Sequence, residues 1–208
     1  MPRGVGISGS IPKARESESE QGRGNSFFVT LDGESEARDS LMDTSDQRLL
    51  GALLDSWDRN NSILVNLLGA LPEGGLDARA MEASPSVGEM LMHMHHVRLV
   101  FIEEDAPEFA RKLPEKEWAV ERDRDRMALM LNESAKTVRD AVKSRVEAGR
   151  EMDLHYDHPI LLLQQMIWHE GYHHGQIKLA LKVSGQALSN KDAGPLTWRI
   201  WMRKSERP

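Results

Sequence analysis

His169 and His173 are the pair of residues in this chain best placed to do chemistry. They are four positions apart, in the stretch from His169 to Gln176 that reads HEGYHHGQ. On an α-helix, side chains at i and i+4 lie above one another on one face, about 6 Å apart. An apolar run over residues 160–167 leads into the stretch, so the helix is expected to be largely buried. Buried imidazoles need partners, and one divalent metal ion can satisfy both. The pair therefore predicts a metal site, with core histidines bonded to backbone groups as the alternative.

A catalytic metal site usually has three protein ligands and an open coordination position. The best third ligand is His93, which on a helical wheel falls beside Met90 and Val97 at the edge of a core-facing stripe. His96 is turned further out and is the substitute ligand or a residue at the rim. The remaining histidines are predicted to face solvent, His95 on the far side of the same helix and the other two in a polar turn (His155, His158).

The stretch also matches H-E-x-x-H, the pattern of zinc metalloproteases in which the glutamate activates water. No histidine follows His174, so a third ligand downstream is missing. Proteases of this type bind an extended peptide along the edge of a sheet, and no stretch of the chain reads convincingly as a strand. Proteolysis is therefore not the favoured function. The helical spacing instead places Glu170 and Gln176 beside the metal, as groups that bind a ligand or orient an imidazole.

Four helices are predicted around these residues. The first begins near Ser45, follows a 3.6-residue apolar period and ends at Pro72, with Asn61 as the polar exception on its stripe. The second opens with a capping box, Ser86 to Glu89, and runs to about Glu104. The other two extend from about Glu121 to Gly149 and from Pro159 to Val183, and a short piece from Leu196 to Trp201 follows. The fold class is all-α, a four-helix bundle whose three long connections permit crossovers.

Composition limits the functions that this bundle can have. The chain has 208 residues and no cysteine, which excludes disulfides, thiolate metal ligands and a cysteine nucleophile. Any thiol in its chemistry must therefore arrive with a ligand. The 27 Lys+Arg against 33 Asp+Glu form no basic block, so no nucleic acid is expected as a partner. No apolar run is long enough to span a membrane, and a cytoplasmic location is expected.

The N-terminal part of the chain differs in composition from the rest. Residues 1–42 are rich in glycine, serine and charged residues and hold one short apolar patch. Such a segment buries too little apolar surface to offset the entropy lost on ordering. We therefore expect a mobile or disordered tail over residues 1–42 and one bundle domain over residues 43–208.

Two motifs together carry a resemblance to a known family. The run from Ser86 to His93, followed some 75 residues later by the HEGYHHGQ stretch, resembles the DinB/YfiT-like superfamily of metal-binding four-helix bundles. The resemblance covers roughly residues 45–202. It implies that His93, His169 and His173 hold one divalent metal. The family often has arginine where this chain has His174, so the anion contact of that arginine is in question here.

The resemblance also implies a function. Family members with assigned activity use low-molecular-weight thiols, so the expected function is a cytoplasmic, thiol-dependent transferase that joins a thiol to a small-molecule electrophile. The expected ion is zinc or nickel, with iron or manganese as alternatives. Glu170 and Gln176 are the candidate catalytic residues, and three residues are candidates for the thiol pocket (Asn61, His174, Gln176). A non-catalytic metal- or small-ligand-binding stress protein and a metal-dependent hydrolase stay open as alternatives, and a homodimer is an open alternative to a monomer.

Overall fold

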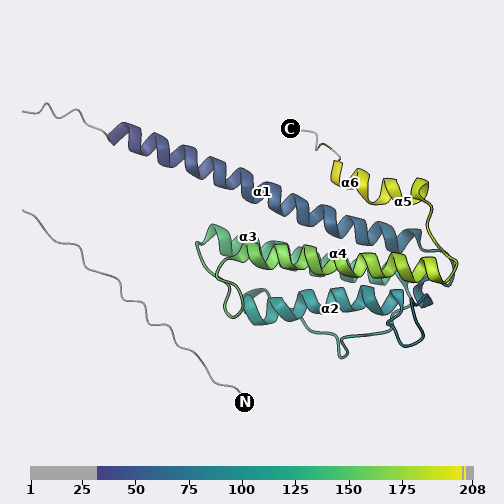
Figure 1. Cartoon of the computed structure of the whole chain (residues 1–208). Coiled ribbons are helices and arrows are strands. Elements are labelled where there is room, and N and C mark those ends of the chain that lie inside the picture. Colours follow the sequence, from purple (N-terminus) through teal and green to yellow (C-terminus); the bar gives the residue numbers. More distant parts are fainter. Residues whose placement is uncertain (1–31, 203, 205–208) are drawn as a thin grey trace, which may run out of the picture. The chain divides into compact units, whose positions relative to one another are not determined.

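The computed structural model describes residues 32–202 and 204, with side chains from Thr44 onward. It contains six α-helices and two 3-10 helices in these residues and no strand among them, which confirms the all-α class. In chain order the elements are α1 (Asp32–Ala70), η1 (Gly75–Asp77), α2 (Val87–Asp105), η2 (Pro107–Phe109), α3 (Arg124–Glu147), α4 (Pro159–Val183), α5 (Asn190–Leu196) and α6 (Trp198–Met202) (Figure 1). The chain divides into two units, Met1–Ser40 and Leu41–Pro208, and the arrangement given below is that of the second.

Helix α1 begins earlier than the sequence predicts. Its first residue is Asp32, whereas the apolar period places the start near Ser45. The period first reaches a core residue at Leu50, so it detects the packed part of the helix and not the turns before it. Of the predicted tail, residues 32–42 are helical and residues 1–31 lie outside the described residues. The division into a tail and a domain at residue 43 stays a prediction.

Local capping signals fix both ends of α4, the start of α2 and the end of α3 where the sequence predicts them, whereas α3 begins at Arg124 and not near Glu121. Ser86 and Glu89 form the complete capping box of α2, each side chain bonding the other residue's backbone N–H. Gly149 and Gly185 follow α3 and α4 with φ of 60° and 73°, the left-handed conformation that glycine adopts without strain. Helix α4 has Pro159 in its first turn, after His158 as N-cap.

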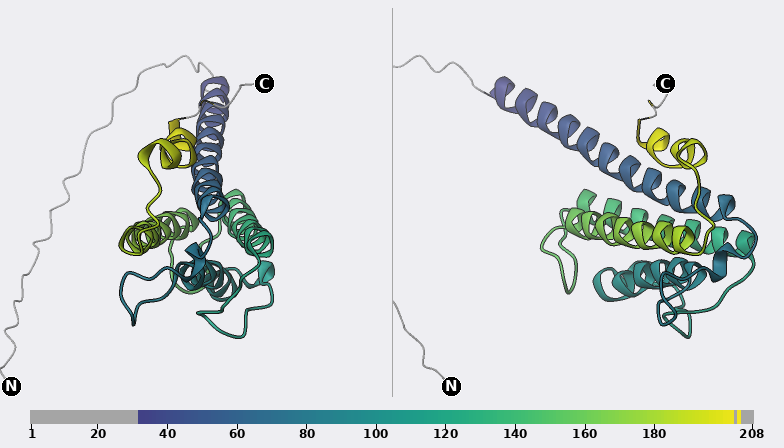
Figure 2. Two further views of the ribbon diagram at one scale, coloured as in Figure 1. Left: turned by 90° about the vertical axis from the view of Figure 1, so that its right-hand side faces the viewer. Right: turned by 45° about the vertical axis from the view of Figure 1, so that its right-hand side comes forward.

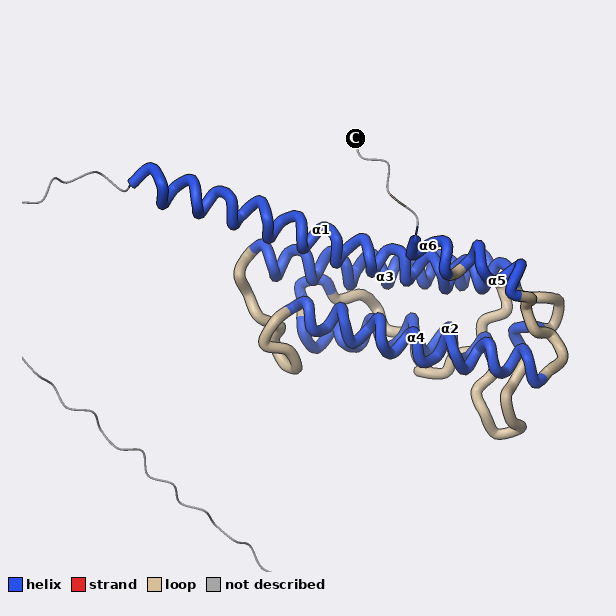
Figure 3. The backbone as a smooth tube through the Cα atoms, turned by 45° about the horizontal axis from the view of Figure 1, so that its top comes forward, coloured by secondary structure: helices blue, strands red, loops and turns tan. Residues whose placement is uncertain are grey.

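Helices α2 and α3 run side by side in the same direction, as the pairs of residues that join them show (Figures 1 and 2). His95 of α2 bonds the carbonyl oxygen of Met130, and Arg98, further along α2, bonds Ser134, further along α3. Because α2 and α3 are parallel, the chain must return from the end of α2 to the start of α3. The connection over residues 106–123 makes this return. This connection runs beside α2 (Figure 1), and the tube view draws it in tan, as it does the other connections (Figure 3).

Helices α1 and α4 run opposite to these two. Trp57 of α1 donates its indole N–H to the carbonyl of Ala135, while the later Asn61 reaches back to Asn132. Glu170 of α4 binds Arg98 of α2. Near the far end of α2, Asp105 accepts bonds from the turn that precedes α4. The face of α2 that carries His93 and the face of α4 that carries His169 and His173 therefore meet in antiparallel fashion.

A polar layer divides the core into two apolar clusters. One cluster lies toward the C-terminal ends of α1 and α4 and includes Leu64, Leu131 and Ile177, and the other is built around Trp57 and Met166. Between them every long helix contributes buried polar side chains, which are bonded to one another (Asn60, Asn61, Arg98, Ser134, Glu170). The layer lies at the level of the histidines of α4, because Glu170 directly follows His169.

The C-terminal segment forms two short helices where the sequence predicts one piece from Leu196 to Trp201. The first, α5, was missed because Pro195 lies inside it, and proline usually signals the end of a helix. Arg59 of α1 donates to the carbonyl oxygens of Ile200 and Trp201 and so ties α6 to α1. Among the described residues, no helix has the length and apolar character needed to cross a membrane.

Candidate metal centre

The structure brings together the three histidines that the sequence selects. His93 of α2 and His169 and His173 of α4 each offer a ring nitrogen, and these nitrogens lie within 4.8 Å of one another. His93 and His173 are buried and His169 is half-buried. Four residues separate the two histidines of α4, so one helical turn places them on a single face. His93 reaches them because α2 packs antiparallel against that face.

The two histidines of α4 already face each other through their Nε2 atoms, which are 3.1 Å apart. Nδ1 of His173 donates to Oε1 of Gln176 at 2.8 Å, because a carbonyl oxygen can only accept. Gln176 is held in turn by the bond from its Nε2 to the hydroxyl of Tyr172 at 2.8 Å. Nε2 of His173 therefore keeps its lone pair and directs it toward His169. A cation between the two nitrogens satisfies both.

His93, the third histidine of the group, packs against an aromatic side chain. Its ring stacks on Trp118, with centroids 4.0 Å apart and planes 3° from parallel. It turns its edge toward the other two imidazoles, at centroid distances of 5.3 Å to His169 and 4.9 Å to His173. Nδ1 of His93 is 3.0 Å from Oε1 of Glu117 without the geometry of a hydrogen bond, and this contact is an ion pair only when His93 is protonated.

The electrostatics of the site favour neutral imidazoles. Burial, together with the neighbouring histidines, lowers the pKa of His93 and of His169 to about 4. Burial also lowers the pKa of His173, opposed by the bond to Gln176 and by the charge of Glu170. At neutral pH the rings carry free lone pairs, and the buried Nδ1 atoms of His93 and His169 have no hydrogen-bond partner. Unprotonated imidazoles with unsatisfied nitrogens are the donor set that a first-row divalent metal requires, so the residues fit the ion.

Glu170 does not join this group, and its assignment as a catalytic residue stays a prediction. Both of its oxygens are engaged by Arg98, at 2.6 Å from Nε and 2.9 Å from Nη2, and Asn60 donates to the second oxygen as well. Neither charged side chain is exposed. Arg98 also lies 4.8 Å from the centre of the Trp57 ring. Glu170 is thus half of a buried ion pair behind the histidines.

Asn61, assigned from the sequence to a thiol pocket, is part of the same polar layer. Its Oδ1 accepts from Nη1 of Arg98 at 3.0 Å, and its Nδ2 donates to Asn132 at 2.7 Å. These bonds engage both ends of the amide, and the assignment of Asn61 to a thiol pocket stays a prediction. His174 is half-buried and outside the trihistidine group, with a pKa lowered by burial and by Lys178. Its buried Nε2 has no partner.

The other histidines have separate positions. His95 was predicted at the surface, and this is wrong: it is 6% exposed, burial lowers its pKa to about 4, and its Nδ1 bonds the Met130 carbonyl at 2.9 Å. On a helical wheel His95 falls on a face of α2 that looks exposed, but this face packs against α3. His96 is half-buried and outside the group. His155 is partly exposed, with Nδ1 2.9 Å from Asp105, and His158 caps α4.

Glu117 and Trp118 approach the site without any signal in the sequence. Both belong to the connection between η2 and α3, which has no periodic pattern. An aromatic residue in a polar loop is the one hint, since such residues often cover a partner surface. Only the return of this connection along α2 brings them to His93.

The comparisons agree with the motifs. The model of the DinB family matches residues 42–199. No curated protein and no solved structure matches the chain.

Proposed function

This chain belongs to the DinB family, and from that premise we propose that it is a metal-dependent transferase that joins a low-molecular-weight thiol to a small-molecule electrophile. The observation that carries the proposal is the trihistidine group of His93, His169 and His173. The proposed ion is zinc or nickel, with iron or manganese as alternatives, because imidazole ligands suit several first-row metals. Bound there, a divalent ion would lower the pKa of a thiol or water that it coordinates.

The residues around the histidines have proposed roles of their own. Gln176 holds the tautomer of His173 that leaves Nε2 free, and Tyr172 fixes Gln176. Trp118 stacks on His93 and is itself 36% exposed, so it offers an apolar wall that a ligand can reach from solvent. His174, with an unpaired Nε2, is the proposed contact of the thiol. The thiol must come from outside because the chain has no cysteine.

The proposal also includes the bundle architecture, the cellular location and the partners of the protein. Helices α1 to α4 form the four-helix bundle of the family, and the connection over residues 106–123 is its crossover. Cytoplasmic location, small-molecule partners without nucleic acid or membrane, and a monomer or homodimer also belong to the proposal.

One observation favours a second candidate, metal-dependent hydrolysis. The carboxylate of Glu117 lies 3.0 Å from His93 and its side chain is 51% exposed, so it could take a proton from water. Glu170, the base expected from the sequence, is occupied by Arg98. A third reading, a binding protein without catalysis, predicts metal uptake with no turnover.

The test uses the cobalt-loaded protein and a panel of thiols: bacillithiol, mycothiol and glutathione. We expect one of them to change the cobalt absorption spectrum, and consumption of a chlorodinitrobenzene to require the same thiol. Both effects should vanish in His93→Ala and persist in His96→Ala, the matched control on the same helix. His174→Arg should change the preference among the thiols. The transferase proposal fails if no thiol alters the spectrum at millimolar concentration.

A further inference from the structure

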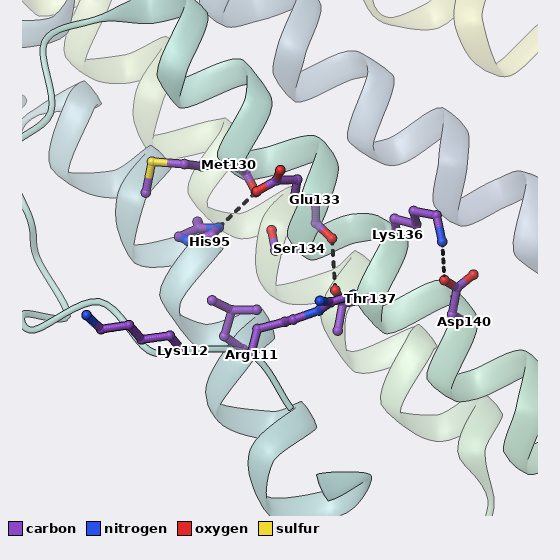
Figure 4. A pocket seen from close by; sticks show the side chains of 10 residues that line it. His95, Arg111, Lys112, Met130, Glu133, Ser134, Lys136, Thr137 and Asp140 are labelled. Carbon is purple, nitrogen blue, oxygen red and sulfur yellow. Dashed lines mark hydrogen bonds and ion pairs between the residues drawn. The ribbon is translucent and has the colours of Figure 1, made fainter. Parts of the chain in front are cut away.

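A second pocket lies on the other side of α2 from the trihistidine group. It is a cavity of about 430 Å³ between α2, α3 and the start of the connection over residues 106–123, with Leu99, Arg111 and Ser134 among its lining residues (Figure 4). Its volume is in the range of small-molecule sites. His93 and His95 are two residues apart, so they point to nearly opposite faces of α2. We propose that this cavity binds a small organic acid that also carries a hydroxyl group.

The floor of the cavity holds a hydrogen-bond acceptor without a partner. The side chain of His95 is buried, and only 6% of the residue's surface is exposed. Its Nδ1 must carry the hydrogen, because it bonds the carbonyl oxygen of Met130 at 2.9 Å (Figure 4). Nε2 of the neutral ring is then an acceptor. No described residue bonds this atom, and His95 lines the cavity. A hydroxyl group of a ligand supplies the missing donor.

The wall beside His95 is apolar. Leu99, one turn further along α2, is 4% exposed, and the side chain of Met130 is half-buried on α3. Both line the cavity. An apolar ligand body fits between the acceptor on the floor and the charged rim, and methionine adapts its shape to such a body.

The rim supplies two cations on one side. Arg111 and Lys112 are exposed, line the cavity, and have no ion pair with a described residue. On the α3 side Lys136 is paired with Asp140, and Glu133 adds a carboxylate. The two side chains extend in opposite directions from the connection, Arg111 toward Thr137, so Arg111 is the cation placed to bind a ligand carboxylate in the cavity (Figure 4). Arginine binds carboxylates through two parallel hydrogen bonds, which gives the rim direction as well as charge.

These three features together require one ligand with a donor at one end, an apolar middle and a carboxylate at the other. The inference rests on α2, α3 and the connection between them, and is independent of the thiol chemistry proposed for the trihistidine group.

The experiment is calorimetric titration with hydroxyphenylpropionate and its two partial analogues, phenylpropionate without the hydroxyl and ethylphenol without the carboxylate. We expect the hydroxy acid to bind at least about tenfold more tightly than either analogue, because each analogue lacks one anchoring interaction. Equal affinities for the three compounds, or no binding at millimolar concentration, would overturn the proposal.

Variants locate the binding. The double variant Arg111→Ala/Lys112→Ala changes only exposed side chains, so it should fold like the parent and lose most of the affinity. His95→Asn keeps a donor for Met130 but removes the more distant ring acceptor Nε2, and should abolish the preference for the hydroxyl. Lys116→Ala, an exposed cation of the same connection that does not line the cavity, is the matched control and should bind normally. Binding that is lost in His169→Ala and kept in the double variant would place the acid at the trihistidine group and sink the inference.

Discussion

Arg98 of α2 and Glu170 of α4 form a two-point ion pair that is closed to solvent, with Nε 2.6 Å from Oε1 and Nη2 2.9 Å from Oε2. Glu170 directly follows His169, and Arg98 lies on the helix that carries His93. The pair therefore fixes α2 against α4 at the level where the histidines meet. Further bonds from Arg98 to Asn61 and to the Leu131 carbonyl extend the constraint to α1 and α3.

Breaking this pair should destabilise the protein strongly. Glu170→Ala leaves the guanidinium of Arg98 buried without its counter-charge, which costs about 3–5 kcal/mol in the free energy of unfolding. Urea denaturation followed by circular dichroism measures the loss. Asp140→Ala, which breaks the solvent-exposed pair with Lys136, is the control and should cost less than about 1 kcal/mol. Equal costs for the two variants would show that the buried pair does not hold the helices together.

The metal content should depend on the three histidines. We expect about one equivalent per chain in the purified protein, from the three-ligand site. Elemental analysis should show most of it lost in His93→Ala, His169→Ala and His173→Ala. His96→Ala, which removes an imidazole outside the group, should keep the metal. Unchanged content in all three ligand variants would eliminate the site.

Gln176 should tune metal affinity without being a ligand. Gln176→Ala removes the acceptor that holds His173 in its tautomer, and loss of such a supporting bond typically weakens metal binding about 10–100-fold. Gln176→Glu keeps an acceptor oxygen and should recover most of the affinity. Competition with a chromophoric chelator measures both. An affinity of Gln176→Ala equal to that of the parent would remove this role.

Removing the metal should leave a folded protein. Two apolar clusters and the polar layer between them are built from side chains other than the three histidines, in contrast to a zinc finger, in which metal binding is folding. Chelation should lower the melting temperature and keep the helical circular dichroism spectrum. A random-coil spectrum after chelation would contradict the expectation.

Acid should weaken the cluster around Arg145, where α3 ends. Its guanidinium binds Glu108 and Asp153 and lowers the pKa of both carboxyls below their ordinary values of 4.5 and 3.8. A carboxyl whose pKa is lower in the folded state adds stability above its unfolded pKa and loses it as the pH falls through the folded value. Asp153→Asn should therefore be less stable than the parent at pH 7, with a difference that shrinks below about pH 4. Melting curves across this range test it, and a difference independent of pH would contradict the assignment.

The features that could be predicted from the sequence are those formed within a single helix. The capping box at Ser86, the glycine after α4 and the spacing of His169 and His173 act between residues a few positions apart. Local geometry alone fixes them, so the ends of α2 and α4 and the shared face of the two histidines could be predicted. His93 was selected because it lies at the edge of the apolar stripe of its helix, beside Met90 and Val97.

The burial and the hydrogen-bond partners of the polar core residues could be seen only in the tertiary structure. His95 is buried because α2 packs against a second, parallel helix on the face that a wheel assigns to solvent. The sequence assigns Glu170 to catalysis and Asn61 to a thiol pocket. In the structure Arg98 engages both side chains, and no pattern within α4 or α1 reveals a cation contributed by α2. Trp118 reaches His93 through the return of the connection over residues 106–123 along α2. Contacts between helices depend on how their faces meet, and the sequence of one helix does not contain that information.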